Sequence, residues 1–174
     1  FWDVAACSLV DKRSAHGVYG EFSRKFATAT ANAPFLEDPL ITESEPGTSV
    51  LPEADDGVDI YAWAQNETST GACAPVRRPA GSGDSLVLVD ATSACGGMSV
   101  DLSQTDVHYF APQKNFSSDG GLWLAFCSPA AIERAERVCA RTDRWIPASL
   151  NLATAITNSR SHQTLNTPAL ATLV

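Results

Sequence analysis

Lysine and net positive charge are scarce in this sequence of 174 residues. It has only three lysines, Lys12, Lys25 and Lys114, and its 20 acidic against 12 basic side chains leave a net charge of −8. A nucleic-acid surface needs a basic patch, whereas the arginines here are scattered along the chain. No apolar run approaches the roughly 20 residues of a membrane span. We therefore expect neither a nucleic-acid-binding protein nor a membrane protein.

The cysteines and histidines lack the spacing of a metal site. No two cysteines form a C-x-x-C pair, and the three histidines show no ligand spacing among themselves or with the cysteines. The cysteines are odd in number and widely separated: Cys7, Cys73, Cys95, Cys127 and Cys139. Several have apolar neighbours, which is typical of reduced, buried thiols. We expect no metal, no disulfide and a cytoplasmic location.

Three common enzyme fingerprints are also missing. The sequence has no G-x-G-x-x-G turn and no P-loop, so a dinucleotide or nucleoside-triphosphate site has no support. It has no G-x-S-x-G elbow, the signature of an α/β-hydrolase serine. The chemistry must therefore come from another arrangement of side chains.

The length allows one domain with a sizeable core. The chain opens without methionine, already in a helical pattern at Phe1, and closes on a pattern that predicts a helix starting at Pro168. We therefore expect an internal piece of a larger protein. The acidic stretch 43–57, rich in Pro and Gly, is expected to be a solvated surface loop.

Apolar periodicity predicts an α/β fold. Helical spacing is found in three segments: 2–12, 21–32 and 129–140. Strand patterns occupy six segments: 14–20, 39–42, 58–64, 85–90, 107–111 and 121–127. Some of these strands are nearly continuous apolar runs, which favours strands buried on both faces. We expect a three-layer α/β/α domain with a mostly parallel sheet and helices on both faces.

Residues that could contact a ligand follow four of these strands. In open α/β sheets, ligands bind outside the carboxyl ends of the strands, so these residues are expected to meet at one edge. They are Glu21 and Phe22, the run Gln65 to Thr68, Asp90, and the run Pro112 to Lys114. An aromatic ring, a hydroxyl, a carboxylate and a lysine would then converge.

Lys114 is the lysine with the most specific setting. In "YFAPQKNFSSDGG" it follows an apolar run and precedes a glycine pair, whereas the other two lysines lie in polar or amphipathic stretches. Together with Asp90 it suits pyridoxal phosphate, which needs a lysine amine for a Schiff base and a carboxylate facing the pyridine nitrogen. Partial shielding from water would lower the lysine pKa and help it act as a general base. The alternative is a lysine that caps a loop and an aspartate that ends a strand.

The segment "DATSACGGMSVDLSQTDVHYFAPQKNFSSDGGLWLAFCSP" resembles the cofactor-lysine region of the phosphoserine aminotransferases. "WAQNETSTG" and "HQTLNTPA" resemble further segments of that family, in the same order. These enzymes belong to the class-V aminotransferases and have the fold-type I architecture. The resemblance implies that residues 1–174 are a partial pyridoxal-phosphate-binding major domain. The family's phosphate loop and amino-terminal segment, and its carboxy-terminal small domain, would lie outside the chain.

The resemblance implies a role for each matching residue. Lys114 would form the Schiff base with the cofactor, Asp90 would pair with its ring nitrogen, and Thr68 would hydrogen-bond its phenolic oxygen. Phe22 would stack on the pyridine ring, where some family members have tryptophan. Gln113 would contact the cofactor phosphate.

Two further residues imply a homodimer with shared sites. Asn166 and Thr167, in "NTP", would reach the cofactor phosphate of the neighbouring subunit. The implied reaction moves the amino group of L-glutamate to 3-phosphohydroxypyruvate, giving O-phospho-L-serine and 2-oxoglutarate. That reaction belongs to serine biosynthesis and, in some organisms, to pyridoxine biosynthesis.

Two other readings stay open from the sequence. Cysteine desulfurases share the aspartate and lysine arrangement, although no desulfurase loop is recognisable here. An inactive fragment that serves only folding or oligomerisation is the other reading. Arg77 and Arg78 are expected to be surface residues rather than substrate ligands. The four tryptophans are expected in the core or at an interface: Trp2, Trp63, Trp123 and Trp145.

Overall fold

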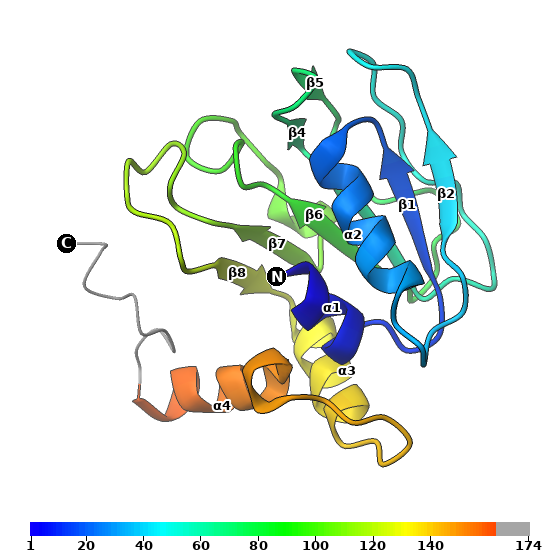
Figure 1. Cartoon of the computed structure of the whole chain (residues 1–174), viewed down its shortest axis with the longest axis vertical. Helices are drawn as coiled ribbons and strands as arrows, with labels where there is room; N and C mark the ends of the chain where they lie inside the picture. Colours follow the sequence, from blue (N-terminus) through cyan, green and yellow to red (C-terminus); the bar gives the residue numbers. More distant parts are fainter. Residues whose placement is uncertain (163–174) are drawn as a thin grey trace.

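Six strands form one sheet in the computed structural model, which describes residues 1–162 (Figure 1). Their order across the sheet is β2-β1-β3-β6-β7-β8, and all neighbours are parallel except β8, which is antiparallel to β7. The bounds are β1 (Ser14–Val18), β2 (Leu40–Glu43), β3 (Ile60–Ala64), β6 (Leu86–Asp90), β7 (Val107–Phe110) and β8 (Leu124–Cys127). The predicted mostly parallel α/β sheet is confirmed; each strand lies inside its predicted segment except β2, which ends at Glu43, one residue after the predicted segment 39–42.

The central strands are apolar because both of their faces are covered. Every residue of β1, β3, β6 and β7 is buried, whereas the outer strand β8 has no buried residue. The register pairs Ala64 with Asp90, so β3 and β6 end at the same edge. A two-stranded hairpin of β4 (Asn66–Glu67) and β5 (Ala72–Cys73) extends from the end of β3.

Four α-helices accompany the sheet: α1 (Trp2–Ser8), α2 (Glu21–Ala31), α3 (Pro129–Cys139) and α4 (Leu152–His162). Two short 3-10 helices, η1 (Leu102–Gln104) and η2 (Ala148–Leu150), lie in connections. Helix α3 begins as its sequence predicts, with the Ser128 hydroxyl accepting a hydrogen bond from the Ala131 amide at 3.1 Å and proline in the first turn. Helix α4 was not predicted from the sequence, because only Leu152 on it is fully buried and its apolar stripe is weak.

Helix α1 ends at Ser8, four residues before the predicted end at Lys12. The guanidinium of buried Arg144 donates hydrogen bonds to the carbonyls of Val10 and Asp11 at 2.8 and 2.7 Å. In a longer helix these carbonyls would instead accept hydrogen bonds from backbone amides of the next turn. The Asp59 carboxylate accepts three successive backbone amides, from Asp11 to residue 13. These long-range contacts, invisible in local periodicity, turn the chain into β1.

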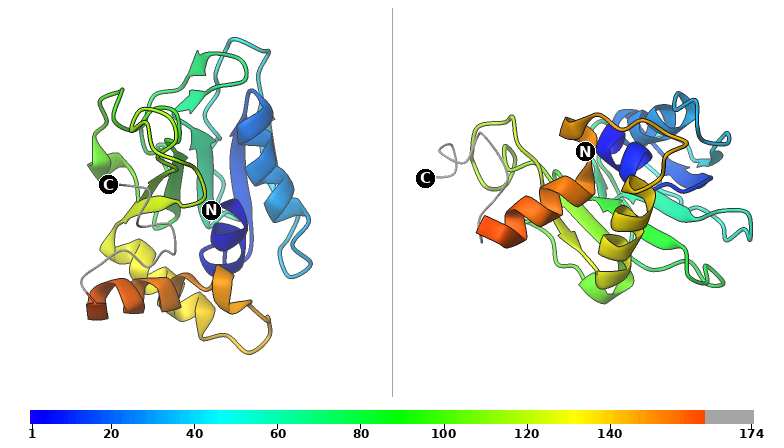
Figure 2. Two further views of the ribbon diagram at one scale, coloured as in Figure 1. Left: turned by 60° about the vertical axis from the view of Figure 1, so that its left-hand side comes forward. Right: turned by 90° about the horizontal axis from the view of Figure 1, so that it is seen from below.

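All four helices contribute to the main core cluster, on one face of the sheet. There the alternate residues Ala62, Leu88 and Tyr109 of three strands meet apolar side chains of the helices, such as Phe26 and Ala135. Two further views show α1 and α2 side by side against the sheet (Figure 2). This layer of helices supports the sheet strands, including β6, which ends at Asp90.

Irregular segments cover the second face of the sheet in the described residues. Tyr61, Trp63 and Val87 face that side and pack against Val50 and Leu51. The chain approaches so closely that a Cβ atom on residue 17, a glycine, would lie 2.3 Å from the carbonyl oxygen of residue 50. The prediction that 43–57 is a solvated surface loop is therefore only partly correct, since its residues Val50 and Leu51 pack against the core. The expected second helical layer is not among residues 1–162.

The five cysteines are all free, but none is fully buried. Four are partly exposed and Cys73 is exposed, so the prediction of buried thiols was wrong. The reason is that most of them lie at or near the end of a helix or strand, and Cys127 also lies on the edge strand β8. Burial still raises the pKa of the Cys127 thiol to about 11.

The described part of the chain has no helix that is both long and apolar enough to span a bilayer. The helix predicted to start at Pro168 lies outside the described residues. Trp145 is 82% exposed, which contradicts a core position for this tryptophan in the described residues.

His16 is a buried histidine held in neutral form. Its Nε2 lies 2.9 Å from the Ser14 hydroxyl and 3.1 Å from the Thr30 hydroxyl, and its ring packs edge-on against Phe26. Burial lowers the pKa of His16 from 6.5 to about 3. The unfolded chain therefore binds a proton here at a pH where the folded chain does not.

We predict that the free energy of unfolding falls as pH is lowered from about 6.5 toward 3, by up to about 1.4 kcal/mol per pH unit from this group. His16→Gln should flatten this dependence, because glutamine does not titrate. Denaturant unfolding at several pH values measures it, with exposed His162→Gln as the matched control. An unchanged slope in His16→Gln would contradict the assignment.

Candidate active site

The strand order reverses between β1 and β3. From β1 the chain continues outward to β2, and from β3 it continues in the opposite direction to β6 and β7. Crevices at such reversals, outside the carboxyl ends of the strands, are where open α/β sheets bind ligands. The segments that flank this crevice are the start of α2 and the hairpin β4–β5.

Asp90 ends β6 at this edge and is 8% exposed. One carboxylate oxygen, Oδ2, accepts a hydrogen bond from Trp2 Nε1 at 3.1 Å, and Oδ1 accepts one from the Thr92 amide at 2.9 Å. Tyr109, on the adjacent strand, interacts with the same carboxylate, and burial raises the pKa of its phenol well above 10. The orientation of the Asp90 carboxylate is therefore fixed from three sides.

Phe22 lies in the first turn of α2 and lines the same small cavity as Asp90. The cavity has a volume of about 10 Å³, which is roughly the room of one water molecule. Phe22 is partly exposed, and the Lys25 ammonium lies 5.2 Å from its ring centre. The structure thus brings together the predicted stacking ring and the predicted partner of the ring nitrogen.

The start of α2 is held by Glu67, whose side chain is completely buried. Its carboxylate accepts hydrogen bonds from the backbone amides of Phe22 and Ser23 at 3.3 and 2.8 Å. The hydroxyls of Ser23 and Ser69 donate to it at 2.9 and 2.6 Å. Burial alone would raise the pKa of Glu67, but these hydrogen bonds together lower it below 4.5.

Thr68 follows Glu67 and is joined to the chain after Asp90 through Ser93. The Thr68 hydroxyl lies 2.8 Å from the Ser93 hydroxyl, which also accepts from Asn66 Nδ2 at 2.8 Å. Ser93 in turn donates to the backbone carbonyl of Asn66 at 3.1 Å. The loop that begins at Asp90 and the hairpin that carries Thr68 therefore form one hydrogen-bonded unit.

The lysine loop is attached to the same unit. Asn115 Nδ2 donates to the backbone carbonyls of Ser93 and Cys95 at 3.2 and 2.9 Å. A Cβ atom at Gly97 would lie 2.8 Å from Asn115 Nδ2, so the glycine permits the close approach of the two loops. Phe116 stacks on Phe110, with ring centres 5.2 Å apart.

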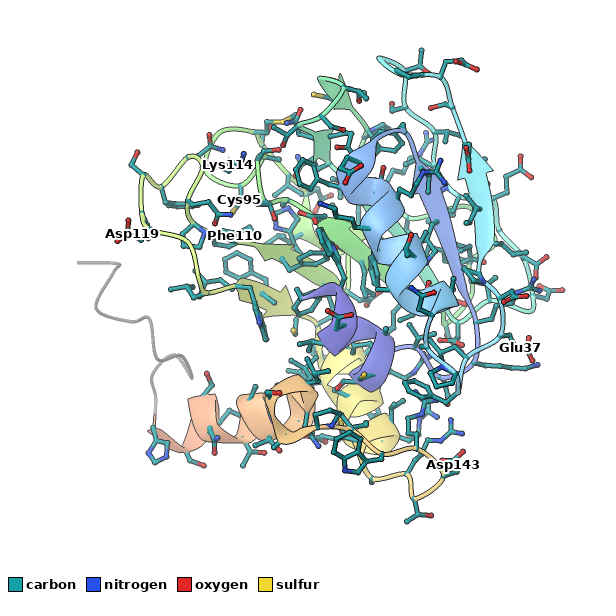
Figure 3. All side chains as sticks on the ribbon, in the orientation of Figure 1. Glu37, Cys95, Phe110, Lys114, Asp119 and Asp143 are labelled. Carbon is teal, nitrogen blue, oxygen red and sulfur yellow. The ribbon has the colours of Figure 1, made fainter. Side chains whose placement is uncertain are left out.

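Lys114 is exposed on this loop (Figure 3). Of the chain's three lysines, Lys12 pairs with Glu37 at 3.3 Å and Lys25 with Glu21 at 3.2 Å. The ammonium of Lys114 has no hydrogen-bond or ion-pair partner in the part of the chain that is described. The expected shielding of this lysine from water is not found there, and Lys114 does not contact Asp90 directly.

Other predicted residues stand apart from this arrangement. Gln113 is exposed beside Lys114. Asn166 and Thr167 lie outside the described residues. Arg78 is engaged elsewhere, since its guanidinium pairs with Asp106 and donates to a backbone carbonyl at 2.8 Å.

A larger cleft of about 460 Å³ lies beside the carboxyl ends of β1 and β2. Its arginine, Arg24, pairs with Glu43 at 2.9 Å, and Glu21 in its lining pairs with Lys25. The cleft also contains Glu45. Since Arg24 is the one cation in its lining among residues 1–162 and is neutralised, and acids prevail, the cleft does not suit a phosphate group.

A family profile, Aminotransferase class-V, matches residues 45–173. The chain therefore belongs to the class-V aminotransferase family. Its membership agrees with the carboxylate and the lysine that the sheet edge presents.

Curated relatives in this family extend well beyond the chain. A phosphoserine aminotransferase of Nocardioides sp. is 61% identical over 175 residues, which cover 99% of this chain and 46% of that protein. A provisionally named phosphoserine aminotransferase of Mycobacterium leprae is 57% identical over 173 residues, with 99% and 46% covered. The chain thus spans about half the length of the curated relatives it matches.

Solved structures share the fold. A phosphoserine aminotransferase from Cytophaga hutchinsonii superposes with a TM-score of 0.83 at 24% identity, over 99% of this chain and 49% of that one. An aspartate aminotransferase from Thermus thermophilus gives a TM-score of 0.78 at 24% identity, over 99% and 50%. These similarities show that the chain has the mostly parallel α/β fold of these aminotransferases.

Sequence reasoning missed Glu67 as a cap, Ser93, Asn115 and the indole of Trp2. Each acts through a partner distant in sequence, so local patterns carry no signal for it. The exception is Ser93 in "DATS", where a hydroxyl just after the strand-ending aspartate could have indicated a contact at the edge.

We predict that Ser93→Ala lowers the free energy of unfolding by about 1–2 kcal/mol, because Asn66 and Thr68 lose a shared partner. Hydrogen exchange should rise in the hairpin 66–73 but not in the loop 112–118, because Asn115 bonds to the backbone carbonyls of residues 93 and 95, which alanine retains. Ser103→Ala, at an exposed serine, is the control. Unchanged exchange in the hairpin would contradict the role of the Ser93 hydroxyl in this unit.

Proposed function

We propose that this chain is the major part of the cofactor domain of a pyridoxal-phosphate-dependent phosphoserine aminotransferase. The reaction would transfer the amino group of L-glutamate to 3-phosphohydroxypyruvate and give O-phospho-L-serine and 2-oxoglutarate. The observation that carries the proposal is the identity of 57–61% over essentially the whole chain to relatives with that name. The placement of Asp90 and Phe22 at one cavity supports it.

The residue types present suit pyridoxal phosphate, and the cavity that Phe22 and Asp90 share has room for about one water molecule. The cofactor needs a carboxylate at its ring nitrogen, a stacking surface and an amine. Asp90 and Phe22 line one cavity, and Lys114 is the lysine without an acidic partner in the described structure. When bound, the cofactor supplies a protonated ring that stabilises negative charge on the carbon that loses a proton.

The chain's own groups would each perform one task. Asp90, held by Trp2 and the Thr92 amide, would accept the hydrogen bond of the ring nitrogen and keep that nitrogen protonated. The amine of Lys114 would hold the cofactor and, when free, would move the substrate proton as a general base. Phe22 would cover one face of the ring.

Contacts to the oxygen atoms of the cofactor complete the proposed site. The Thr68 hydroxyl would hydrogen-bond the phenolic oxygen, and Gln113 would contact the phosphate. Asn166 and Thr167 would reach the phosphate of the neighbouring subunit in a homodimer with shared sites. The protein would act in the cytoplasm, in serine biosynthesis and in some organisms in pyridoxine biosynthesis.

Borohydride reduction of the chain with pyridoxal phosphate tests the site directly. We predict a stable label on Lys114, identified by peptide mass spectrometry, and no label in Lys114→Ala. Asp90→Asn should weaken binding by roughly 10- to 100-fold, since it removes a charged hydrogen-bond partner. Exposed Asp84→Asn is the matched control. A label on Lys12 or Lys25 in preference to Lys114 would contradict the proposed site.

The substrate assignment is tested by product analysis. A protein that carries this chain, given L-glutamate and 3-phosphohydroxypyruvate, should form O-phospho-L-serine, and Lys114→Ala should abolish the product. L-cysteine in place of both substrates should release no sulfur. Sulfur release would favour a cysteine desulfurase. Cofactor binding with neither product would favour a fragment that serves folding or oligomerisation.

A further inference from the structure

Phe22 and Thr68 come from separate segments, yet both flank the crevice where the strand order reverses. The Glu67 side chain contacts both segments. We propose that Glu67 is a positioning residue of the cofactor site: its buried carboxylate holds the first turn of α2, and with it Phe22, against the hairpin that carries Thr68. This inference rests on the proposed function, because it assigns Phe22 to a cofactor ring.

The contacts of Glu67 are distributed between the two segments. On the α2 side they are the backbone amides of Phe22 and Ser23 and the Ser23 hydroxyl. On the hairpin side they are the amide of Ser69 at 3.2 Å and its hydroxyl at 2.6 Å. Ser69 reaches back as well, since its hydroxyl accepts the Glu21 amide at 2.9 Å. A shift of Phe22 relative to Thr68 would have to break several of these bonds.

Gly20 makes room for the carboxylate. A Cβ atom at this position would lie 2.4 and 2.5 Å from Cγ and Cδ of Glu67, and 2.5 Å from the Ser69 hydroxyl. These distances are below any normal contact, so a larger residue would displace Glu67 from the helix start. Gly20, directly before α2, thus makes room for this contact and takes the place of a residue with a capping side chain.

The carboxylate also decides which part of a ligand the start of α2 can bind. The amides of Phe22 and Ser23 are occupied by Glu67 and are not available to a phosphate. A second anion there would be repelled by the buried negative charge. The start of α2 therefore serves the ring of the cofactor through Phe22, and not its phosphate.

A double-mutant cycle tests the inference, with dissociation constants measured by absorbance titration of the full chain. Glu67→Gln should weaken binding of pyridoxal phosphate about tenfold. In a Phe22→Ala background the same change should have an effect within about twofold, because the group that Glu67 positions is gone. Exposed Glu133→Gln, on helix α3, should bind like the parent chain.

Pyridoxal, which lacks the phosphate, provides the second readout. Glu67→Gln should weaken pyridoxal and pyridoxal phosphate by the same factor, since it acts on the ring. A loss confined to pyridoxal phosphate would place Glu67 at the phosphate and overturn the inference. An equal loss with and without Phe22 would mean a merely structural role, and would overturn it too.

Thermal unfolding of each variant without cofactor separates folding from positioning. If Glu67→Gln does not fold, Ser69→Ala takes the place of that variant in the same cycle, because it removes the 2.6 Å hydrogen bond to the carboxylate. Normal affinity in a folded Glu67→Gln variant would overturn this inference alone. No binding by the parent chain would overturn the proposed function and, with it, this inference.

Discussion

The buried carboxylate of Glu67 is the contact on which the candidate site depends. It lies where the strand order reverses, and it replaces the missing side-chain cap of α2 with an acceptor from another segment. Anions are favourable at the start of a helix, which compensates for much of the cost of burying this charge. The helix start thereby becomes a fixed point for Phe22, and the hairpin becomes a fixed point for Thr68.

A second fixed point lies at the end of β6. Asp90 is oriented by Trp2 and by the turn that follows it, and that turn leads to Ser93. Ser93 then connects the hairpin on one side and, through Asn115, the lysine loop on the other. Three loops that are distant in sequence are thus joined by short polar contacts above a rigid parallel sheet. Lys114 extends from the outermost of these loops and stays exposed.

The sequence predicted the strands, because apolar runs ending in polar residues are a local signal, and the end of β6 at Asp90 was located correctly. It also predicted α2 and α3 nearly residue for residue. It could not predict that α1 stops at Ser8, because Arg144, far along the chain, takes the carbonyls beyond it. The role of Glu67 was equally hidden, since an acid after a strand usually indicates solvent. Family resemblance named the site residues, whereas the structure supplied the network that holds three of them.

A crystal structure of this chain with pyridoxal phosphate tests the central claim most directly. The account predicts a cofactor ring against Phe22, its nitrogen within hydrogen-bond distance of Asp90, continuous electron density to Lys114 Nζ, and Glu67 still bound to the amides of Phe22 and Ser23. A cofactor bonded to Lys12 or Lys25, or a ring seated away from Phe22 and Asp90, would contradict it.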